Sequence, residues 1–228
     1  MVPFSFAQME WRIVGTRALY WVAENALVVA DLHLEKASFY AQTGQMLPPY
    51  DSRATLSALA DALRTTGARR VFCLGDNFHD STGPQRMEPH AAGMLDALTR
   101  AAEFVWITGN HDAEMPTLSA PLPGTTATQL AISGIWLRHR ATSGATGPEL
   151  SGHFHPRLRL TARGRRIARP CTVASENRLI LPAFGSLTGG MDAADPVILA
   201  AMQPAQSVCA LLAAGNKLVR YPLWPGIT

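Results

Sequence analysis

The stretch RVFCLGDNFHD, residues 70–80, joins a short apolar run to a glycine and a group of polar side chains. Two other stretches also join an apolar run to polar side chains: FVWITGNHD at residues 104–112, again with a glycine, and ALVVADLH at residues 26–33, without one. Apolar runs of this length are typical of buried strands. The carboxyl ends of parallel strands meet at one edge of a sheet, where the sites of α/β proteins form. The three stretches therefore predict a parallel sheet with polar side chains gathered at its carboxyl edge.

The segments between these strands have helical patterns. Leucines recur at helical spacing up to Gly67, and either Asp51 or Ser52 is expected to cap this helix. A second helix is expected over residues 90–102. Because strands alternate with helices, the first half of the chain predicts an α/β fold with right-handed crossovers.

From about residue 125 the pattern changes to short strands and turns. Strands are expected at 129–132, 135–139, 158–161, 179–182, 196–202 and 208–213. The two halves are predicted to pack as facing sheets with helices outside. The length of 228 residues fits one domain, so residues 1–228 are expected to form a single unit.

The composition excludes several classes of protein. Hydrophobic residues make up 47% of the chain and charged residues 16%, which is typical of a folded protein and not of a disordered one. The apolar runs are far shorter than the roughly 20 residues of a membrane span, and no signal-peptide pattern is recognised. We therefore expect a cytoplasmic protein without membrane contact. The three cysteines have no metal-like spacing, which argues against a disulfide framework or a thiolate zinc site.

Histidines next to acids or amides are the most informative feature of the sequence. Asp31 and His33 are two residues apart, as are His153 and His155, so each pair would share one face of an extended chain. The full set of candidate metal ligands is Asp31, His33, Asp76, Asn110, His139, His153 and His155. Mixed nitrogen and oxygen donors in this number suit two divalent ions, with Mn expected first and Fe, Zn or Ni as alternatives.

A second feature is a run of arginines. Between residues 151 and 175 the chain has no acid and six arginines: Arg157, Arg159, Arg163, Arg165, Arg166 and Arg169. Such a patch suits a polyanion. The alternation of arginine with leucine equally fits the solvent face of a hairpin with its tip near Gly164. Both interpretations stay open.

The ordered motifs resemble the calcineurin-like metallophosphoesterase superfamily over about residues 27–156. The segments DLHLEK, GDNFHD, SGHFHP and LPAFGSLTGG further resemble the bacterial ligase-associated DNA damage response endonuclease subfamily, up to about Gly190. This resemblance implies a four-layer α/β/β/α sandwich. It also implies two metal positions that share Asp76: Asp31, His33, Asp76 and His155 hold one ion, and Asn110, His139 and His153 complete the other.

The resemblance further implies that His111 lies beside the metals, where it protonates the leaving oxygen or binds the phosphoryl group. The superfamily has an acid three residues after the bridging aspartate, whereas this chain has His79 there and Asp80 one place later. Either of them is therefore expected to orient His111, with Asp80 as the second candidate catalytic residue. His79 and Arg157 are candidate substrate-binding residues.

The leading functional hypothesis is a dinuclear phosphoesterase or phosphodiesterase that attacks phosphate esters with metal-activated hydroxide. The subfamily resemblance makes DNA a candidate substrate, with DNA ligase and helicase as candidate partners. A small-molecule pyrophosphatase acting on a nucleotide-sugar compound is the alternative enzyme. A non-catalytic interaction module on the same fold is the third hypothesis, and failure to bind any divalent ion would favour it.

Overall fold

The computed structural model describes residues 1–112, 122–145, 147–162 and 164–224. In chain order its elements are β1 (Val2–Phe6), β2 (Met9–Val14), β3 (Ala18–Trp21), β4 (Ala26–Val29), α1 (Lys36–Ala41), α2 (Asp51–Thr66), β5 (Arg70–Leu74), α3 (Gly83–Arg86), α4 (Pro89–Ala101), β6 (Glu103–Ile107), β7 (Thr125–Ala127), β8 (Gln129–Ile132), β9 (Ile135–Arg138), β10 (Glu149–Ser151), β11 (Arg157–Ala162), β12 (Arg165–Pro170), β13 (Thr172–Ala174), β14 (Arg178–Ile180), α5 (Pro196–Ala201), β15 (Val208–Ala214) and β16 (Lys217–Trp224).

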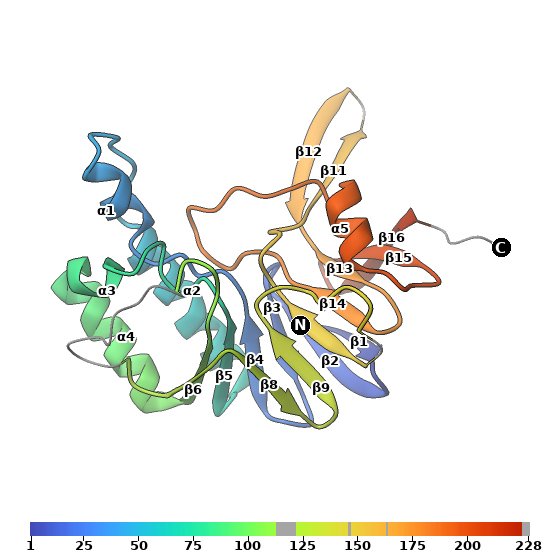
Figure 1. Cartoon of the computed structure of the whole chain (residues 1–228), viewed down its shortest axis with the longest axis horizontal. Coiled ribbons are helices and arrows are strands. Elements are labelled where there is room, and N and C mark those ends of the chain that lie inside the picture. The colour runs from blue at the N-terminus through green and yellow to red at the C-terminus, as the bar shows by residue number, and fades with distance from the viewer. Residues whose placement is uncertain (113–121, 146, 163, 225–228) are drawn as a thin grey trace.

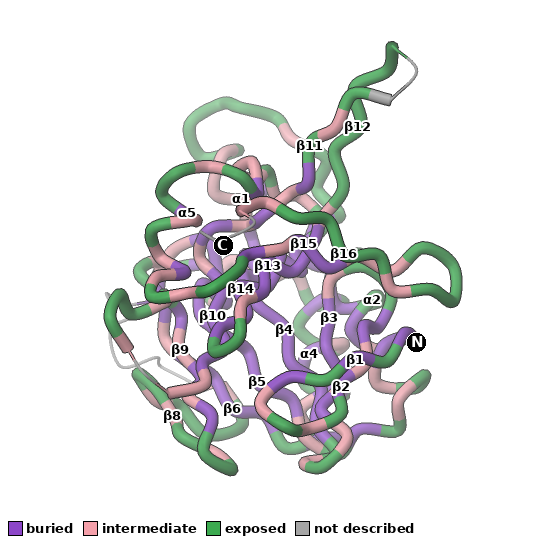
Figure 2. The backbone as a smooth tube through the Cα atoms, turned by 90° about the vertical axis from the view of Figure 1, so that its right-hand side faces the viewer, coloured by how far each residue is buried: buried purple, intermediate pink, exposed green. Residues whose placement is uncertain are grey.

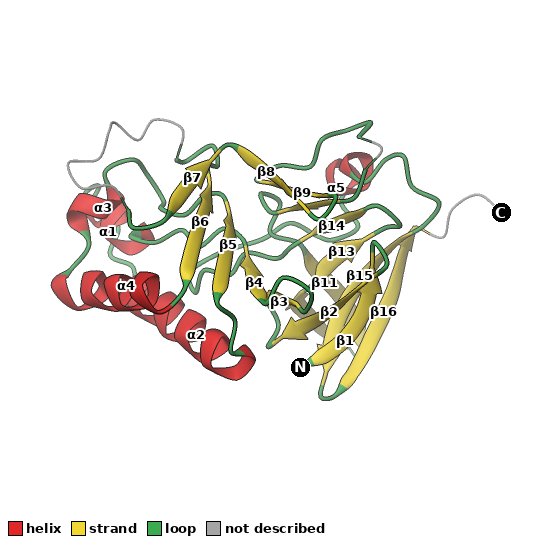
Figure 3. Ribbon diagram, turned by 90° about the horizontal axis from the view of Figure 1, so that it is seen from below, coloured by secondary structure: helices red, strands yellow, loops and turns green. Residues whose placement is uncertain are grey.

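The first sheet contains β1 to β7 in sequence order. Strands β1 to β4 form an antiparallel meander, and β4 to β7 are parallel. Helix α2 connects β4 with β5, and α4 connects β5 with β6, so both helices lie against the same face of the sheet (Figure 3). The parallel sheet predicted from the first half of the sequence is confirmed for these strands.

The second sheet has the order β16-β15-β13-β14-β10-β9-β8. Helix α5 lies on the outer side of this sheet (Figure 1). Strands β11 and β12 form a separate two-stranded sheet, and their hairpin projects away from the body of the molecule (Figures 1 and 2). At the base of the hairpin, Arg157 forms a single β-bridge to Asp192. Among the described helices, none has the length and apolar character that crossing a bilayer requires.

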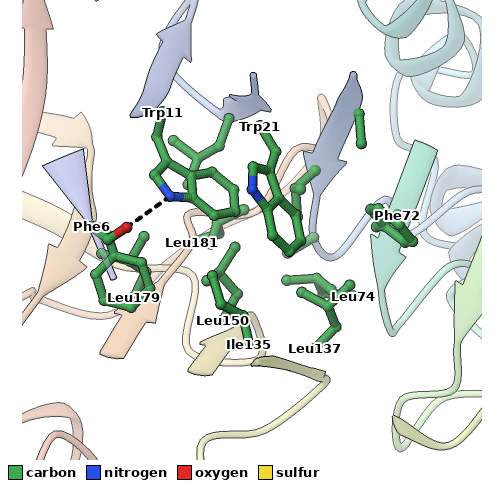
Figure 4. Close-up of a cluster of buried hydrophobic side chains, with 14 of the residues drawn as sticks. Phe6, Trp11, Trp21, Phe72, Leu74, Ile135, Leu137, Leu150, Leu179 and Leu181 are labelled. Atoms are coloured by element: carbon green, nitrogen blue, oxygen red, sulfur yellow. Dashed lines mark hydrogen bonds between the residues drawn. The ribbon is translucent and has the colours of Figure 1, made fainter. Parts of the chain in front are cut away.

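Three hydrophobic cores separate four layers. The central core lies between the two sheets and contains the stacked indoles of Trp11 and Trp21, whose ring centroids are 4.6 Å apart, together with Leu150 of the second sheet (Figure 4). A second core packs the first sheet against α2 and α4. A third packs the second sheet against α5 through Ile198. The layers follow the predicted order α/β/β/α, so the expected sandwich is confirmed.

Two local predictions are wrong. Residues 196–202, expected as a strand, form helix α5, because Asp195 accepts a hydrogen bond from the backbone N–H of Val197 and Pro196 occupies the first helical turn. Neither Asp51 nor Ser52 caps α2. Their side chains accept instead from the backbone N–H groups of Ala37 and Glu35, and so fasten α1 to α2.

Candidate metal centre

Loops from both sheets meet at the carboxyl edge of β4, β5 and β6. The backbone N–H of Asp31 donates to the carbonyl of Gly75 at 3.1 Å, and that of His33 donates to the carbonyl of Asp76 at 2.9 Å. The loop after β10 is bonded to the same place, because the backbone N–H of His153 donates to Oδ2 of Asp31 at 2.9 Å. The expected ligands therefore come together on loops that bind each other.

The backbone conformation of these loops differs from the prediction. Five of the seven candidate ligands have positive φ: Asp31 (53°), His33 (44°), Asp76 (47°), His153 (74°) and His155 (50°). Residues of each pair were expected to share one face because the chain would be extended there. That expectation is wrong, because the chain is not extended at these residues. The side chains converge because left-handed turns follow the strands, a conformation that is uncommon for residues other than glycine.

Three glycines allow this close approach. A Cβ atom at Gly75 would overlap the ring of His139, and one at Gly109 would overlap the backbone nitrogen and carboxylate of Asp76. A Cβ at Gly152 would overlap the carboxylate of Asp31. Glycine is therefore required by space at all three positions, and at Gly75 also by backbone conformation, since its φ is 82°.

The first group of donors comprises Asp31, His33 and His155. The Nε2 atoms of the two imidazoles are 3.2 Å apart, and Nε2 of His155 is 3.5 Å from Oδ1 of Asp31. Asp31 is fully buried, and His33 is 5% exposed. One cation between these atoms would contact all three side chains.

The second group comprises Asp76, His139 and His153. Nε2 of His139 lies 3.5 Å from Oδ1 of Asp76 and 3.0 Å from Nδ1 of His153. The side-chain oxygen of Asn110 is 2.9 Å from the same Nε2 atom and 3.1 Å from Nδ1 of His153. Oδ2 of Asp76 is in turn 3.8 Å from Nε2 of His33, so Asp76 lies between the two groups.

The electrostatics of both groups suit divalent cations. Burial, reinforced by the neighbouring imidazoles, lowers the pKa of His33 to about 2, and burial lowers that of His153 to about 4. Both rings are therefore neutral at pH 7, the form that binds a metal. Burial raises the pKa of Asp31, and an ionised carboxylate in this position needs a cation nearby. Nδ1 of His33 has no hydrogen-bond partner among the described residues.

His111 lies at the open side of this cluster. Its side chain is 38% exposed, and its Nε2 atom is 3.9 Å from Oδ2 of Asp76. The imidazole stacks on the ring of His79, with centroids 5.2 Å apart and an interplanar angle of 22°. His79 is packed in turn against Phe39, with centroids 4.8 Å apart. A ring nitrogen of His111 also lies within ligand spacing of donor atoms of His33 and Asp76.

Asp80 has a different set of contacts from His79. Its carboxylate accepts two hydrogen bonds from Arg86, at 3.0 and 2.5 Å, and one from Thr82 at 2.8 Å. These bonds hold α3 next to the loop after β5. Of the two residues expected to orient His111, the structure therefore places His79 against its ring and pairs Asp80 with Arg86.

Asp112 is a buried residue to which the sequence reasoning gave no role. Its carboxylate accepts from the backbone N–H groups of Asn77, Phe78 and Gly109 and from the side-chain amide of Asn77. It therefore ties the loop that carries Asp76 to the loop that carries His111. The only sequence signal was its place at the end of the GNHD motif.

Arg157 begins β11, two residues after His155. Its half-buried side chain runs past Gly190, and its guanidinium donates to the carbonyl of Ala168 at 3.4 Å. The structure therefore places Arg157 at the base of the projecting hairpin. Arg163 lies outside the described residues.

Comparisons with known proteins agree with this geometry. The family model for the calcineurin-like phosphoesterase matches residues 25–208. The crystal structure of Pseudomonas putida nuclease MPE is similar at 27% sequence identity, over 96% of this chain and 98% of that chain, with a TM-score of 0.72. Comparison with curated protein sequences gave no match.

Two further solved structures are more distant. The phosphoesterase Yfce from E. coli is 13% identical over 87% of this chain and 98% of that chain, with a TM-score of 0.42. A predicted phosphoesterase from Streptococcus pneumoniae TIGR4 is 11% identical over 92% of both chains, with a TM-score of 0.33. The family match covers most of the chain and includes every loop of the donor cluster. This chain therefore belongs to the calcineurin-like phosphoesterase family and is a metal-dependent phosphoric ester hydrolase.

Proposed function

We propose that this phosphoesterase is a nuclease, a phosphodiesterase that cleaves DNA with two divalent ions, manganese first among them. The observation that carries the proposal is the pair of donor groups on either side of Asp76. The nuclease assignment is supported by the likeness to Pseudomonas putida nuclease MPE, which extends over nearly the whole of both chains.

In this proposal Asp31, His33 and His155 would hold one ion and Asn110, His139 and His153 would hold the other, with Asp76 available to both. Bound divalent ions would supply activation of water and neutralisation of charge on the phosphoryl oxygens. The protein supplies neutral imidazoles and buried carboxylates in fixed positions. Hydrogen bonds from the backbone N–H of His153 to Asp31 and from that of His111 to Asp76 hold the two carboxylates.

His111 is proposed to donate a proton to the leaving oxygen. Its exposed side chain can reach a substrate, and its backbone N–H is anchored to Oδ1 of Asp76 at 3.0 Å. His79 acts as a positioning residue, because its ring fixes the plane of the His111 imidazole. Burial lowers the pKa of His79 to about 4, so this ring acts by packing and not by charge. Asp80 is proposed to hold α3 next to the loop after β5 by accepting hydrogen bonds from Arg86.

The test compares substrates with one metal-loaded preparation. The Mn-loaded protein is incubated with single-stranded DNA, duplex DNA, a bis-aryl phosphate diester, an aryl monoester and a nucleotide-sugar pyrophosphate. Asp76→Ala removes the shared ligand, and Asp96→Ala on the exposed face of α4 is the matched control. We expect hydrolysis of DNA and of the diester that is lost in Asp76→Ala and kept in Asp96→Ala.

Two outcomes would overturn the proposal. Preference for the pyrophosphate over both DNA substrates would favour the small-molecule pyrophosphatase. Failure to bind any divalent ion, measured by elemental analysis, would favour the non-catalytic module.

A cytoplasmic location and DNA ligase or helicase partners belong to the same proposal. The three free cysteines, Cys73, Cys171 and Cys209, suit a reducing compartment. The repair partners rest on the subfamily resemblance alone. Co-purification of the protein with a ligase or helicase from its own cells would test them.

A further inference from the structure

The hairpin of β11 and β12 concentrates positive charge outside the metal centre. Arg159, Arg165, Arg166 and Arg169 are all exposed, and among the described residues none of them forms an ion pair with an acid. The hairpin stands clear of the body of the molecule (Figures 1 and 2). Among the described residues, Arg165, Arg166 and Arg169 have no side-chain hydrogen bond, and Arg159 donates one, to the carbonyl of Gly190 at 2.9 Å, whereas the buried Arg178 donates to four carbonyls.

The strand register sorts these arginines onto two faces. Residues opposite each other in an antiparallel pair share a face, and successive residues alternate between faces. Arg157 and Arg159 therefore lie on one face with Arg166, which is paired with Thr161. We call this the arginine face; its other members are Ala168 and Pro170, opposite Arg159 and Arg157.

The opposite face has a different character. Leu158 is paired with Arg169, and Leu160 with Ile167. This leucine face borders an apolar groove that β15 and β16 help to line, including Tyr221. Arg159 and Arg166 line a separate groove on the hairpin itself, together with Thr161 and Ala168 of the same face and with Leu160 and Ile167 of the leucine face. By strand register the two faces differ in their side chains, although residues of both faces border each groove, and each face carries exposed arginines.

The arginine face starts at the metal centre. His155, a candidate ligand, is two residues before Arg157, and Arg159 donates to the carbonyl of Gly190 at 2.9 Å. Six residues of extended chain carry β11 about 20 Å outward. At the B-form rise of about 3.4 Å per nucleotide, this length matches about six nucleotides of one strand.

We infer that the arginine face of the β11–β12 hairpin binds the phosphate backbone of a nucleic-acid strand beyond the phosphate at the metal centre. The inference rests on the proposed nuclease function and adds to it a second binding surface. Guanidinium groups bind phosphates through paired hydrogen bonds. A membrane surface fits this face less well, because Thr161, Ala168 and Pro170 offer no large apolar side chain for insertion.

The test uses two variants with the same change of charge on the same hairpin. Arg159→Gln with Arg166→Gln removes two cations from the arginine face, and Arg165→Gln with Arg169→Gln removes two from the leucine face. Affinity for a hydrolysis-resistant single-stranded phosphorothioate oligonucleotide well over six nucleotides long is measured as a function of salt, with the Mn-loaded protein. Hydrolysis of the bis-aryl diester is measured in parallel.

For the arginine-face variant we expect roughly tenfold weaker binding and a salt slope smaller by about 1.4, since each contact to a single strand contributes about 0.7. The leucine-face variant should keep the wild-type slope. Diester hydrolysis should stay within about twofold in both variants, since that substrate is too short to reach the hairpin. Arg159→Lys with Arg166→Lys should keep most of the salt slope, which separates lost charge from a displaced Gly190 loop.

Three outcomes would overturn the inference: equal loss of salt slope in both glutamine variants, an unchanged slope in both, or binding to anionic vesicles that only the arginine-face variant loses. Failure of the proposed nuclease function is distinct from these, since the wild-type protein would then hydrolyse the diester without cleaving DNA.

Discussion

At the scale of single residues, the donor cluster is built on backbone conformations that cost free energy by themselves. A non-glycine residue with positive φ costs on the order of 1–3 kcal/mol, and five candidate ligands have this conformation. The surrounding backbone hydrogen bonds, such as those between Asp31 and Gly75 and between His33 and Asp76, hold the turns in place. The donors are therefore positioned before an ion arrives, which favours tight and geometrically selective binding.

Replacing His111 with alanine should keep both metals and slow the chemistry. We expect kcat on DNA to fall by about 10²- to 10⁴-fold, because a proton donor to the leaving oxygen is lost. The loss should be smaller for an aryl diester, whose leaving group needs no proton. Elemental analysis of the variant is the control: a lost metal ion would place His111 among the ligands, as its spacing from His33 and Asp76 allows.

The role of His79 is separable from that of Asp80. His79→Ala removes the ring that stacks on His111, so kcat should fall about tenfold or more with little change in KM. His79→Phe keeps a flat ring and should restore most of kcat, since the native ring is neutral and acts by packing. Equal loss in the alanine and phenylalanine variants would show that His79 acts through a ring nitrogen instead.

Gly109→Ala tests whether the space next to Gly109 is needed to keep Asp76, the shared ligand, in position. The new methyl group would overlap Asp76, so we expect metal affinity to fall about 10- to 100-fold, as for other changes behind a ligand. Gly93→Ala, in the middle of α4 with nothing within 4 Å, is the matched control. It should bind metal normally and stabilise the fold by about 1 kcal/mol. Isothermal titration with Mn²⁺ measures the first effect, and metal affinity equal to wild type in Gly109→Ala would refute it.

The sequence predicted which residues gather at the cluster but not how the backbone brings them there. Asp31 and His33 were identified by residue type and by their place after a strand, which are visible in one dimension. Their left-handed turns depend on hydrogen bonds to Gly75 and Asp76, more than 40 residues away in the chain. The role of Asp112 was not predictable for the same reason, because its partners at Asn77 and Phe78 are set by tertiary contact.

At the scale of elements, the strands and helices with strong local patterns were predictable. Helix α2 ends at Gly67, which has positive φ, as its leucine spacing and glycine stop indicated. Helix α5 was not predictable from its pattern. Its apolar run PVILAA has a length that fits a buried strand as well as a helix. The Asp195-Pro196 pair is the signal that decides for a helix. Short strands such as β10 have too few residues to show a period and became visible only in the sheet.

Arg178 links α5 to the loop after β9, and its loss should destabilise both. Its buried guanidinium donates to the carbonyls of Thr142, Ala145, Ala201 and Gln203. Arg178→Met leaves these carbonyls without their donor, and we expect the free energy of unfolding to fall by about 3 kcal/mol or more. Arg64→Met on exposed α2 should change it by less than about 0.5 kcal/mol. Urea unfolding measures both.

None of the Arg178 contacts involves a candidate ligand, so turnover of the Arg178→Met protein should match wild type while it is folded. A stability loss no larger than that of Arg64→Met would mean that water replaces the guanidinium at these carbonyls.

At the scale of the whole molecule, each sheet takes part in two cores. The first sheet has one face on α2 and α4 and the other on the central core, and the second sheet lies between the central core and α5. If one core unfolds, it exposes a sheet that also packs in a neighbouring core. That residues 1–228 form one domain stays a prediction, and this sharing of sheets is its physical argument.

We predict that the protein unfolds in a single thermal transition, and that metal ions raise the Tm of this transition. The donors come from both sheets, so an ion binds only when both are folded together. At an Mn²⁺ concentration of 100 times Kd, binding should add about 2.7 kcal/mol to the free energy of unfolding, and Tm should rise by roughly 5–10 °C over the chelated protein. Scanning calorimetry with and without chelator measures this. Two transitions, with only one of them sensitive to Mn²⁺, would show that the sheets unfold independently and that the ligands of one sheet suffice to bind metal.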